Sequence, residues 1–445
     1  MAIQTSDFLS FKGGIKLPRA FKAKTANKAI ERLPLPTKVI IPLDQHLGRS
    51  ARPLYKTGDE VLAGTKIAES AGECSASIHA PITGRITQIK EMPHPLKGQG
   101  KAMVIESEER EIDLFQKETK TDLSPLAPEE IIQTVKENGI VGLGGAAFPT
   151  HIKLSPPKDK KIDAYILNGA ECEPYLTCDQ RLMVEKTREI VKGFKLLMQA
   201  VEVEKGYIAI EGNKPEAVKV FRKITIQEPG LEVVVLKVKY PQGAEKQLIQ
   251  AVLNREVPSG TFPYQVGVIV SNAATAYAVY QAFYEDTPLI ERVVTLDGAV
   301  NNPGNFWVRI GTTVRELIDK SGGLKKEPKK IIMGGPMMGF AQYTLDVPII
   351  KGSSGILVFS EEMVMTKEEF PCIQCGRCSE VCPVNLMPNK IALFARNNLW
   401  EKTEEYHLCD CMECGACAYN CPSGIPLVHW IKFAKCELAK LKNKL

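Results

Sequence analysis

The chain contains the run Cys372-Ile-Gln-Cys375-Gly-Arg-Cys378-Ser-Glu-Val-Cys382-Pro383, and its spacing is repeated in Cys411-Met-Glu-Cys414-Gly-Ala-Cys417-Ala-Tyr-Asn-Cys421-Pro422. The shared pattern, C-x2-C-x2-C-x3-C-P, is typical of proteins that hold two [4Fe–4S] clusters, in which the fourth cysteine of each run ligates the other cluster. The sequence therefore predicts two clusters near the C-terminus. The predicted ligands are Cys372, Cys375, Cys378 and Cys421 for the first cluster, and Cys411, Cys414, Cys417 and Cys382 for the second.

Zinc and disulfides explain these runs less well. Zinc sites usually pair C-x2-C units that are separated by a dozen or more residues, and they do not require three cysteines in one tight loop. Eight of the 13 cysteines lie in the two runs, and the other five are scattered, which favours a reducing compartment over a disulfide scaffold. We expect Cys409 to be a spare thiol and Cys178 to be a packing residue.

Length and composition indicate a large globular chain without a nucleic-acid partner. A chain of 445 residues has room for several domains, and its 44% hydrophobic and 24% charged content is ordinary. The net charge of +5 is small for this length. Residues 1–10 show no signal-peptide pattern, and no apolar stretch of about 18–20 residues occurs. We expect a chain that is cytoplasmic or lies on the cytoplasmic face of a membrane.

The pattern of elements predicts a multidomain α/β plus β fold. An N-terminal arm comes first, and short β-rich runs broken by glycine then predict a barrel–sandwich hybrid of the lipoyl-like kind. Ser75–Ser77 occupy the place of the lysine that a swinging-arm carrier needs, so a structural module is expected. The predicted domains are an arm at 1–36, the barrel–sandwich hybrid at 37–120, a Rossmann-like α/β domain at 121–290, a β-grasp (SLBB-type) module at 291–362 and a two-cluster ferredoxin-like α domain at 363–445.

Strands and helices alternate in the central domain, as in α/β folds. The predicted strands are 164–168, 206–211, 231–238 and 267–271, and the predicted helices are 181–201, 215–223, 244–253 and 274–284. At the C-terminus, apolar residues recur at helical spacing from Leu427 to Leu441 with lysines on the other face. Such a helix can pack against its own domain or a neighbouring subunit, or lie on an anionic membrane.

Two polar loops of the central domain are candidate ligand sites. Gly142-Leu-Gly144-Gly145-Ala-Ala-Phe148 presents backbone N–H groups that no side chain obstructs, which suits a phosphate. The loop follows a helix, whereas a dinucleotide fingerprint follows a strand, so a plain turn is the alternative. Asn168-Gly-Ala-Glu171-Cys172-Glu173 follows a predicted strand, where α/β sheets bind ligands. A solvated polar loop is the alternative there.

These loops, together with Pro241–Lys246 and Ser271–Thr275, resemble the FMN- and NADH-binding loops of the flavoprotein subunit of respiratory complex I. The ordered set of modules, with Phe11-Lys-Gly-Gly-Ile-Lys-Leu-Pro18 at the start, resembles the C subunit of the Rnf electron-transport complex. That resemblance covers essentially the whole chain.

The resemblance implies a role for each loop residue. Gly142, Gly144, Gly145 and Lys153 would cradle the FMN phosphate and ribityl chain; Asn168, Asn272 and Thr275 would hold the flavin or its phosphate; Phe148 would stack on the nicotinamide nucleotide; and Glu171, Glu173 and Glu245 would line the nicotinamide and ribose side. Phe148, Glu171 and Glu173 form the expected catalytic set. Ala170 stands where complex I has an aspartate, so flavin-ring contacts are expected to differ.

The resemblance implies a peripheral subunit, on the cytoplasmic side of the cell membrane, of a ferredoxin:NAD+ oxidoreductase. It would exchange hydride with NAD(H) at FMN and pass single electrons through the clusters, since a flavin handles both one and two electrons. Other subunits would couple this reaction to ion translocation, and ferredoxin would be the electron partner of the complex. One alternative is a soluble cobalamin reductase of diol-utilising microcompartments, against which the Phe11–Pro18 arm and Tyr175 argue. Another is a non-catalytic electron relay.

Overall fold

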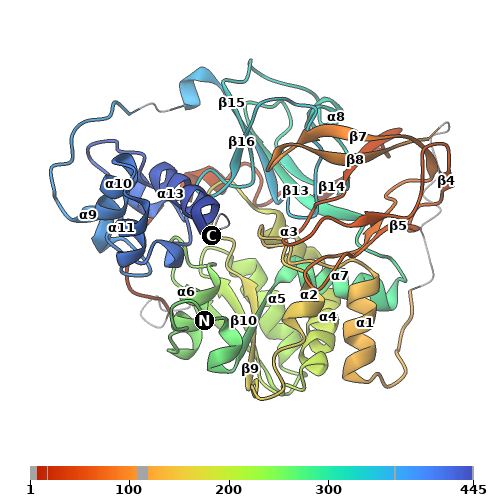
Figure 1. Ribbon diagram of the computed structural model, residues 1–445. Coiled ribbons are helices and arrows are strands. Elements are labelled where there is room, and N and C mark those ends of the chain that lie inside the picture. Colours follow the sequence, from red (N-terminus) through yellow and green to blue (C-terminus); the bar gives the residue numbers. More distant parts are fainter. Residues whose placement is uncertain (1–7, 18, 108–118, 365–366, 443–445) are drawn as a thin grey trace.

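The computed structural model describes residues 8–17, 19–107, 119–364 and 367–442. In Figure 1 the α/β domain lies at the bottom, the barrel–sandwich domain and a six-stranded sheet lie above it, and the C-terminal helices lie at the left. The predicted fold class is confirmed by this arrangement. Residues 108–118, near the end of the predicted barrel–sandwich domain, and Pro18 of the arm motif fall outside the described residues.

The α/β domain is built on a parallel sheet with the strand order β11-β10-β9-β12. Its strands are β9 (Ala164–Gly169), β10 (Gly206–Glu211), β11 (Leu231–Leu236) and β12 (Val268–Asn272). Successive side chains of a strand point to opposite faces. Tyr165 and Leu167 therefore join the core made with the helices at 128–137, 187–200 and 273–284, whereas Ala164 and Ile166 join the core made with the helix at 245–253.

Helices cover both faces of this sheet. They are α1 (Pro128–Glu137), α2 (Thr150–Lys153), α3 (Cys178–Glu185), α4 (Thr187–Ala200), α5 (Pro215–Thr225), α6 (Glu245–Leu253) and α7 (Ala273–Tyr284). The predicted single helix 181–201 is wrong, because it is two helices that meet at Lys186, whose φ of −126° and ψ of 34° are not helical. The sequence at this break contains no glycine or proline, so its helical pattern continued through it.

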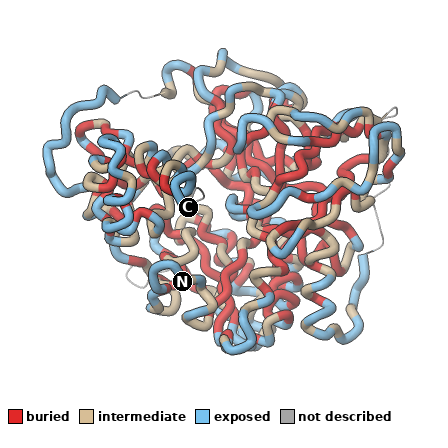
Figure 2. Tube along the Cα trace, in the orientation of Figure 1, coloured by how far each residue is buried: buried red, intermediate tan, exposed pale blue. Residues whose placement is uncertain are grey.

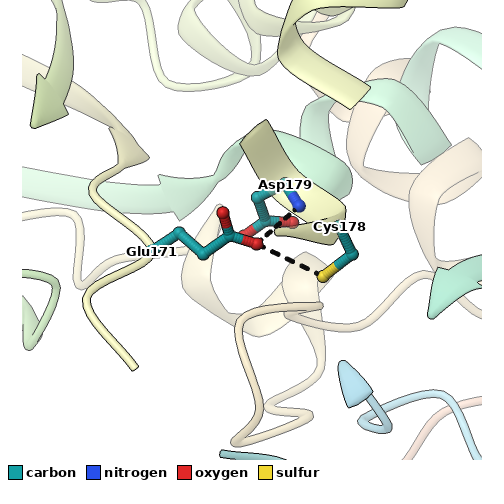
Figure 3. A group of neighbouring side chains, drawn as sticks. All are labelled: Glu171, Cys178 and Asp179. Carbon is teal, nitrogen blue, oxygen red and sulfur yellow. Dashed lines mark hydrogen bonds between the residues drawn. The ribbon is translucent and has the colours of Figure 1, made fainter. Parts of the chain in front are cut away.

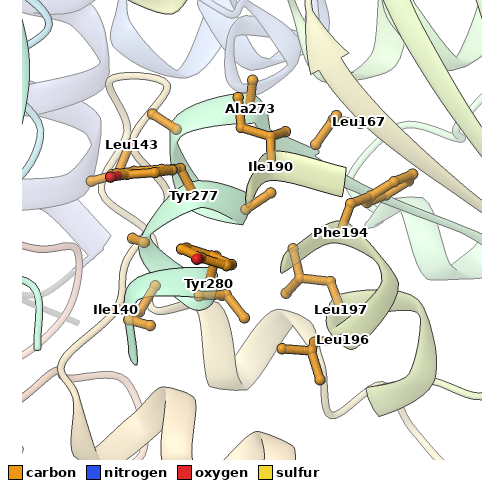
Figure 4. Packing of buried hydrophobic residues seen from close by; sticks show 14 of the residues in the cluster. Ile140, Leu143, Leu167, Ile190, Phe194, Leu196, Leu197, Ala273, Tyr277 and Tyr280 are labelled. Atoms are coloured by element: carbon orange, nitrogen blue, oxygen red, sulfur yellow. The ribbon is translucent and has the colours of Figure 1, made fainter. Parts of the chain in front are cut away.

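Helices α4 and α7 pack closely, with Ile190, Phe194 and Leu197 of α4 beside Tyr277 and Tyr280 of α7 (Figure 4). A Cβ atom at Gly193 would overlap the carbonyl oxygen of Ala276. This glycine therefore allows the two helix backbones to touch.

The barrel–sandwich domain consists of two small sheets around one apolar core. Its strands are β2 (Lys38–Pro42), β3 (Arg52–Pro53), β4 (Glu60–Val61), β5 (Lys66–Glu69), β6 (Ile78–His79), β7 (Gly84–His94) and β8 (Gly98–Glu106). Ser75 and Ser77 are buried. The segment that would carry a modifiable lysine in a carrier domain is therefore buried within this protein.

The SLBB-type module is a six-stranded sheet with the order β1-β14-β13-β17-β15-β16. Its elements are β1 (Ile30–Arg32), β13 (Glu291–Gly298), β14 (Gly304–Arg309), α8 (Val314–Lys320), β15 (Lys330–Met333), β16 (Phe340–Gln342) and β17 (Gly355–Phe359). Strand β1 comes from the predicted arm and pairs in parallel with β14. This part of the arm is thus an edge strand of the sheet and does not only lie over the surface of another domain.

The C-terminal domain is helical and surrounds the cysteine runs. Its α-helices are α9 (Arg377–Glu380), α10 (Pro388–Arg396), α11 (Trp400–Glu405), α12 (Ala416–Tyr419) and α13 (Leu427–Lys442). Short 3-10 helices occur along the whole chain, at η2 (Arg19–Lys22), η3 (Pro263–Val266), η4 (Glu361–Met363) and η5 (Leu408–Asp410). The apolar face of α13, including Ile431 and Leu438, packs with Ile391 and Ala395 of α10. Residues 367–376 ahead of α9 are exposed, as the pale blue loop at the left of Figure 2 shows. Among the described residues, no helix combines the length and apolarity needed to cross a membrane.

Two buried cations join the domains at the start of the glycine loop. The ammonium of Lys351 donates to the carbonyl oxygens of Ser77 (2.6 Å) and Gly139 (2.7 Å). The guanidinium of Arg292 donates to the carbonyl oxygens of Lys351 and Leu143. Burial lowers the pKa of Lys351 to about 7. The barrel–sandwich domain, the α/β domain and the SLBB-type module therefore meet through one lysine.

We expect Lys351 to make the stability of the protein rise with pH above neutrality. Between pH 7 and its ordinary pKa near 10.5 the unfolded chain binds a proton at this lysine that the folded chain does not, so the free energy of unfolding rises with pH. Chemical denaturation at pH 7 and pH 9 should show the wild type gaining up to about 2 kcal/mol relative to Lys351→Met. An unchanged difference between the two proteins would contradict the low pKa.

Candidate functional site

The glycine loop lies between Val141 and Pro149, which pair with each other. The N–H of Leu143 donates to the buried hydroxyl of Thr275 on α7 at 2.9 Å. Gly145 has a φ of +114°, and a Cβ atom there would meet nothing within 4 Å. Residues 144–146 are exposed, and within the described part of the chain their amides have no hydrogen-bond acceptor. The loop is therefore anchored at one end and presents free N–H groups to solvent, an arrangement that suits an anion.

Two asparagines lie under this loop at the carboxyl edge of the sheet. Asn168 of β9 and Asn272 of β12 are register neighbours. Asn168 donates to the carbonyl oxygen of Gly243 at 2.8 Å. The side-chain oxygen of Asn272 caps α7, and its amide nitrogen donates to Asp179 at 2.6 Å. A Cβ atom at Gly144 would lie 3.4 Å from the Cβ atom of Asn272, so the glycine loop and the strand ends share one site.

Lys153 brings a positive charge to the same edge. Its ammonium nitrogen lies 2.6 Å from a carboxylate oxygen of Glu245 and 2.8 Å from the carbonyl oxygen of Val270. The side chains of Lys153 and Glu245 are 30% and 37% exposed. Both are therefore accessible to a ligand at the loop.

Glu171 caps the N-terminus of α3, as Figure 3 shows. Its carboxylate accepts hydrogen bonds from the N–H groups of Asp179 (2.8 Å) and Gln180 (3.1 Å), and the thiol of Cys178 lies 3.5 Å away. Burial and the charge of Glu171 raise the pKa of Asp179 to about 7. Since Asp179 also accepts from Asn272, Glu171 connects through Asp179 to the strand end that lies beside the glycine loop.

The carboxylate of Glu173 is directed elsewhere. It accepts hydrogen bonds from the N–H groups of Met337 (3.1 Å) and Met338 (2.9 Å), in the turn between β15 and β16. Burial raises the pKa of Glu173 to about 7. Phe148 is half-buried at the end of the glycine loop. Of the three residues expected to be catalytic, Glu171 and Phe148 thus lie near the loop and Glu173 faces the SLBB-type module.

The cysteines form two separate groups. One cavity is lined by Cys372, Cys375, Cys378 and Cys421. In the other group, burial and the neighbouring thiols of Cys411 and Cys382 raise the pKa of Cys414 to about 12. Burial, together with the thiols of Cys414, Cys411 and Cys382, also raises the pKa of Cys417. Each run therefore contributes three cysteines to one group and its fourth to the other, which fits two clusters.

Sequence reasoning missed Asp179, Arg292 and Tyr240. The first two lie beside the glycine loop or its neighbours, and Tyr240 donates to the carbonyl oxygen of Cys414 at 2.7 Å. Only Asp179 could have been found from the sequence, because it lies in the first turn of a helix that follows an acidic loop. Nothing local marked Arg292, because its acceptors come from distant segments.

Family models match four segments of the chain. They are the RnfC barrel sandwich hybrid domain at residues 9–110, the Nuo51 FMN-binding domain at 135–281, the SLBB domain at 293–341 and the 4Fe-4S dicluster domain at 371–425. Relatives that match along most of the chain indicate the same family as these models. The C subunit of the proton-translocating ferredoxin:NAD(+) oxidoreductase complex of Clostridium ljungdahlii is 46% identical over 96% of this chain and 94% of its own length. The chain belongs to the RnfC family.

Two more RnfC proteins are similar over 98% of the chain. The C subunit of the Na(+)-translocating ferredoxin:NAD(+) oxidoreductase complex of Acetobacterium woodii is 43% identical and is covered over 98% of its length. The C subunit of the ion-translocating oxidoreductase complex of Haemophilus influenzae is 41% identical and is covered over 67% of its length. The expected family is confirmed, and the matched FMN-binding and 4Fe-4S dicluster domains are where the two kinds of cofactor were expected. The roles of individual residues stay predictions.

We expect the fourth cysteine of each run to serve the other cluster. In a Cys372→Ala/Cys375→Ala background, which removes the first ligand group, about four irons per chain should remain. Adding Cys382→Ala should lower this iron content, whereas adding Cys421→Ala should not. Cys436→Ala, which removes an exposed thiol outside both groups, is the control. The reverse pattern would mean that each run holds its own cluster.

Proposed function

We propose that this chain is the peripheral, NAD(H)-reactive subunit of a membrane-bound ferredoxin:NAD+ oxidoreductase complex. It would exchange hydride with NAD(H) at FMN and pass single electrons through two [4Fe–4S] clusters. The observation that carries the proposal is the exposed glycine loop, with free amides, at the carboxyl edge of a parallel sheet in a chain that also groups eight cysteines into two sets of four. Bound FMN would supply the conversion between two-electron and one-electron chemistry.

The residues of the loop fit an anionic nucleotide. The amides of residues 144–146 would donate to the phosphate, and Lys153 would neutralise part of its charge after loosening its contact with Glu245. Thr275 would keep the loop in place through the N–H of Leu143. Asn168 and Asn272 would be held ready by their contacts to the backbone of residues 170 and 274.

The nicotinamide side of the site would be formed by Phe148, Glu171 and Glu245. Phe148 would stack on the nucleotide, and the two carboxylates would bind its ribose and orient the ring. For Glu173, the contacts to residues 337 and 338 favour a role in holding domains together over contact with NAD(H). The second cysteine group lies against the flavin-binding domain, since Cys414 and Tyr240 share one buried cluster, and this arrangement suits a relay that leads away from the site.

The family supports a proposal for the position in the cell. The names of the relatives describe subunits of ion-translocating complexes, and we propose that other subunits span the membrane and hold this one at its cytoplasmic side. Co-purification with integral membrane proteins would support this place. A chain that purifies alone from a microcompartment fraction would instead favour the cobalamin-reductase alternative.

Activity of the isolated chain tests the proposal directly. After anaerobic reconstitution with FMN, iron and sulfide, the chain should oxidise NADH with an artificial electron acceptor. Intact flavin and clusters without NADH oxidation would refute the catalytic assignment. Clusters without any flavin would leave the electron-relay alternative.

We expect Lys153→Ala to weaken binding of FMN by about 10- to 100-fold, because a charge-assisted hydrogen bond to the phosphate is lost. Binding of riboflavin, which lacks the phosphate, should change much less. Flavin fluorescence titration of both ligands measures the difference, and Lys158→Ala, on an exposed loop, is the matched control. An equal loss for FMN and riboflavin would place Lys153 away from the phosphate.

A further inference from the structure

Residues Tyr240–Gly243, within the loop between β11 and α6, contact two sites at once. The carbonyl oxygen of Gly243 accepts a hydrogen bond of 2.8 Å from the side-chain amide of Asn168, which lies at the carboxyl edge of the sheet. Tyr240 donates its hydroxyl to the carbonyl oxygen of Cys414 at 2.7 Å. Tyr240 is 1% exposed, so water does not compete for this hydrogen bond.

The turn between β15 and β16 holds the same cysteine from another side. A Cβ atom at Gly415, whose φ is +80°, would lie 3.1 Å from the carbonyl oxygen of Met337. Glu173 fixes this turn by accepting the N–H groups of Met337 and Met338. A Cβ atom at Gly335 would overlap the carboxylate of Glu173, so the close approach depends on glycine at position 335.

Glu173 and Tyr240 also face each other. A carboxylate oxygen of Glu173 lies 3.4 Å from the hydroxyl oxygen of Tyr240. A phenol has one proton to donate, and the shorter contact to Cys414 takes it. The two side chains therefore form one buried unit that spans the α/β domain, the SLBB-type module and the second cysteine run.

The N-terminal arm completes the enclosure of the second ligand group. Ile15 exchanges two backbone hydrogen bonds of 2.8 Å with Tyr240. The N–H of Gly14 donates to Val381 at 2.8 Å, and a Cβ atom at Gly13 would lie 2.8 Å from the carbonyl oxygen of Cys382. Both Cys414 and Cys382 are thus held through their backbones by segments of other domains.

The first ligand group differs. Cys372 and Cys375 are exposed, and the cavity that they line with Cys378 and Cys421 is formed, within the described residues, by the C-terminal domain alone. The contacts from outside the domain are therefore specific to the second group.

We propose that Tyr240 is a positioning residue for the second cluster, fixing the Cys414 backbone relative to the flavin site, with Glu173 and the Met337–Met338 turn as its support. The proposal rests on the proposed function for the identity of the two sites. The position of the ligands and the hydrogen bonds around a cluster set its reduction potential. Tyr240 bonds to the carbonyl oxygen of Cys414 and not to its sulfur, so removing the hydroxyl changes the second cluster through the position of the Cys414 backbone.

Tyr240→Phe tests this role in the reconstituted full chain. An EPR-monitored redox titration with a chemical reductant should give a shifted midpoint potential and an altered signal for the second cluster only. A chelator should extract the iron of that cluster about two- to tenfold faster, as expected for the loss of one hydrogen bond. Tyr165→Phe removes another buried hydroxyl, which bonds to Ser271, and should leave both clusters unchanged.

Glu173→Gln provides a second test if Tyr240→Phe does not fold. It keeps the size of the side chain but replaces one acceptor oxygen, and it should accelerate iron extraction from the second cluster while leaving the first unchanged. Unchanged potential, signal and extraction rate in folded Tyr240→Phe or Glu173→Gln would overturn the proposal. None of these measurements uses NADH or FMN, so a failure of the proposed function, seen as absent flavin binding or absent NADH oxidation, is distinguished from a failure here.

Discussion

The placement of the glycine loop depends on buried cations that are satisfied by carbonyl oxygens. Lys351 and Arg292 bind backbone oxygens at the start of the loop, at Gly139 and Leu143. A buried charge or dipole without a partner costs several kcal/mol, so these contacts fix the positions of three domains at once. Because these contacts fix the start of the loop, the exposed amides of residues 144–146 can remain without hydrogen-bond acceptors among the described residues.

The joints between domains use the main chain as well as apolar side chains. Gly139, Gly335 and Gly415 each lie where a Cβ atom would press on the backbone or on a carboxylate of another domain. Glu173 and Tyr240 then bond to backbone groups of the segments that approach. Hydrogen bonds have narrow distance and angle ranges, so such contacts specify distance and orientation more tightly than an apolar interface does. This suits a protein whose sites must keep fixed positions relative to one another.

The sequence predicted what local chemistry encodes. Cysteine spacing indicated two clusters, and the alternation of strands with helices indicated the parallel sheet. The break at Lys186 was missed because no glycine or proline marks it. The orientation of Glu173 was missed for a different reason: its acid-rich loop predicted a ligand site, whereas its partners lie more than a hundred residues away in the SLBB-type module. Contacts between distant segments leave no periodic pattern in a single sequence.

The N-terminal arm has a consequence for biosynthesis. Strand β1 pairs with β14, with Ile30 opposite Asn305, and the N–H of Gly14 donates to the carbonyl oxygen of Val381. The segments around residues 14 and 30 can therefore dock only after the segments around residues 305 and 381 have been made. Contacts so distant along the chain form slowly, and unpaired strand edges on a nascent chain invite misassembly. Closure of the arm would thus be a late step of maturation, after which the second cysteine group becomes enclosed.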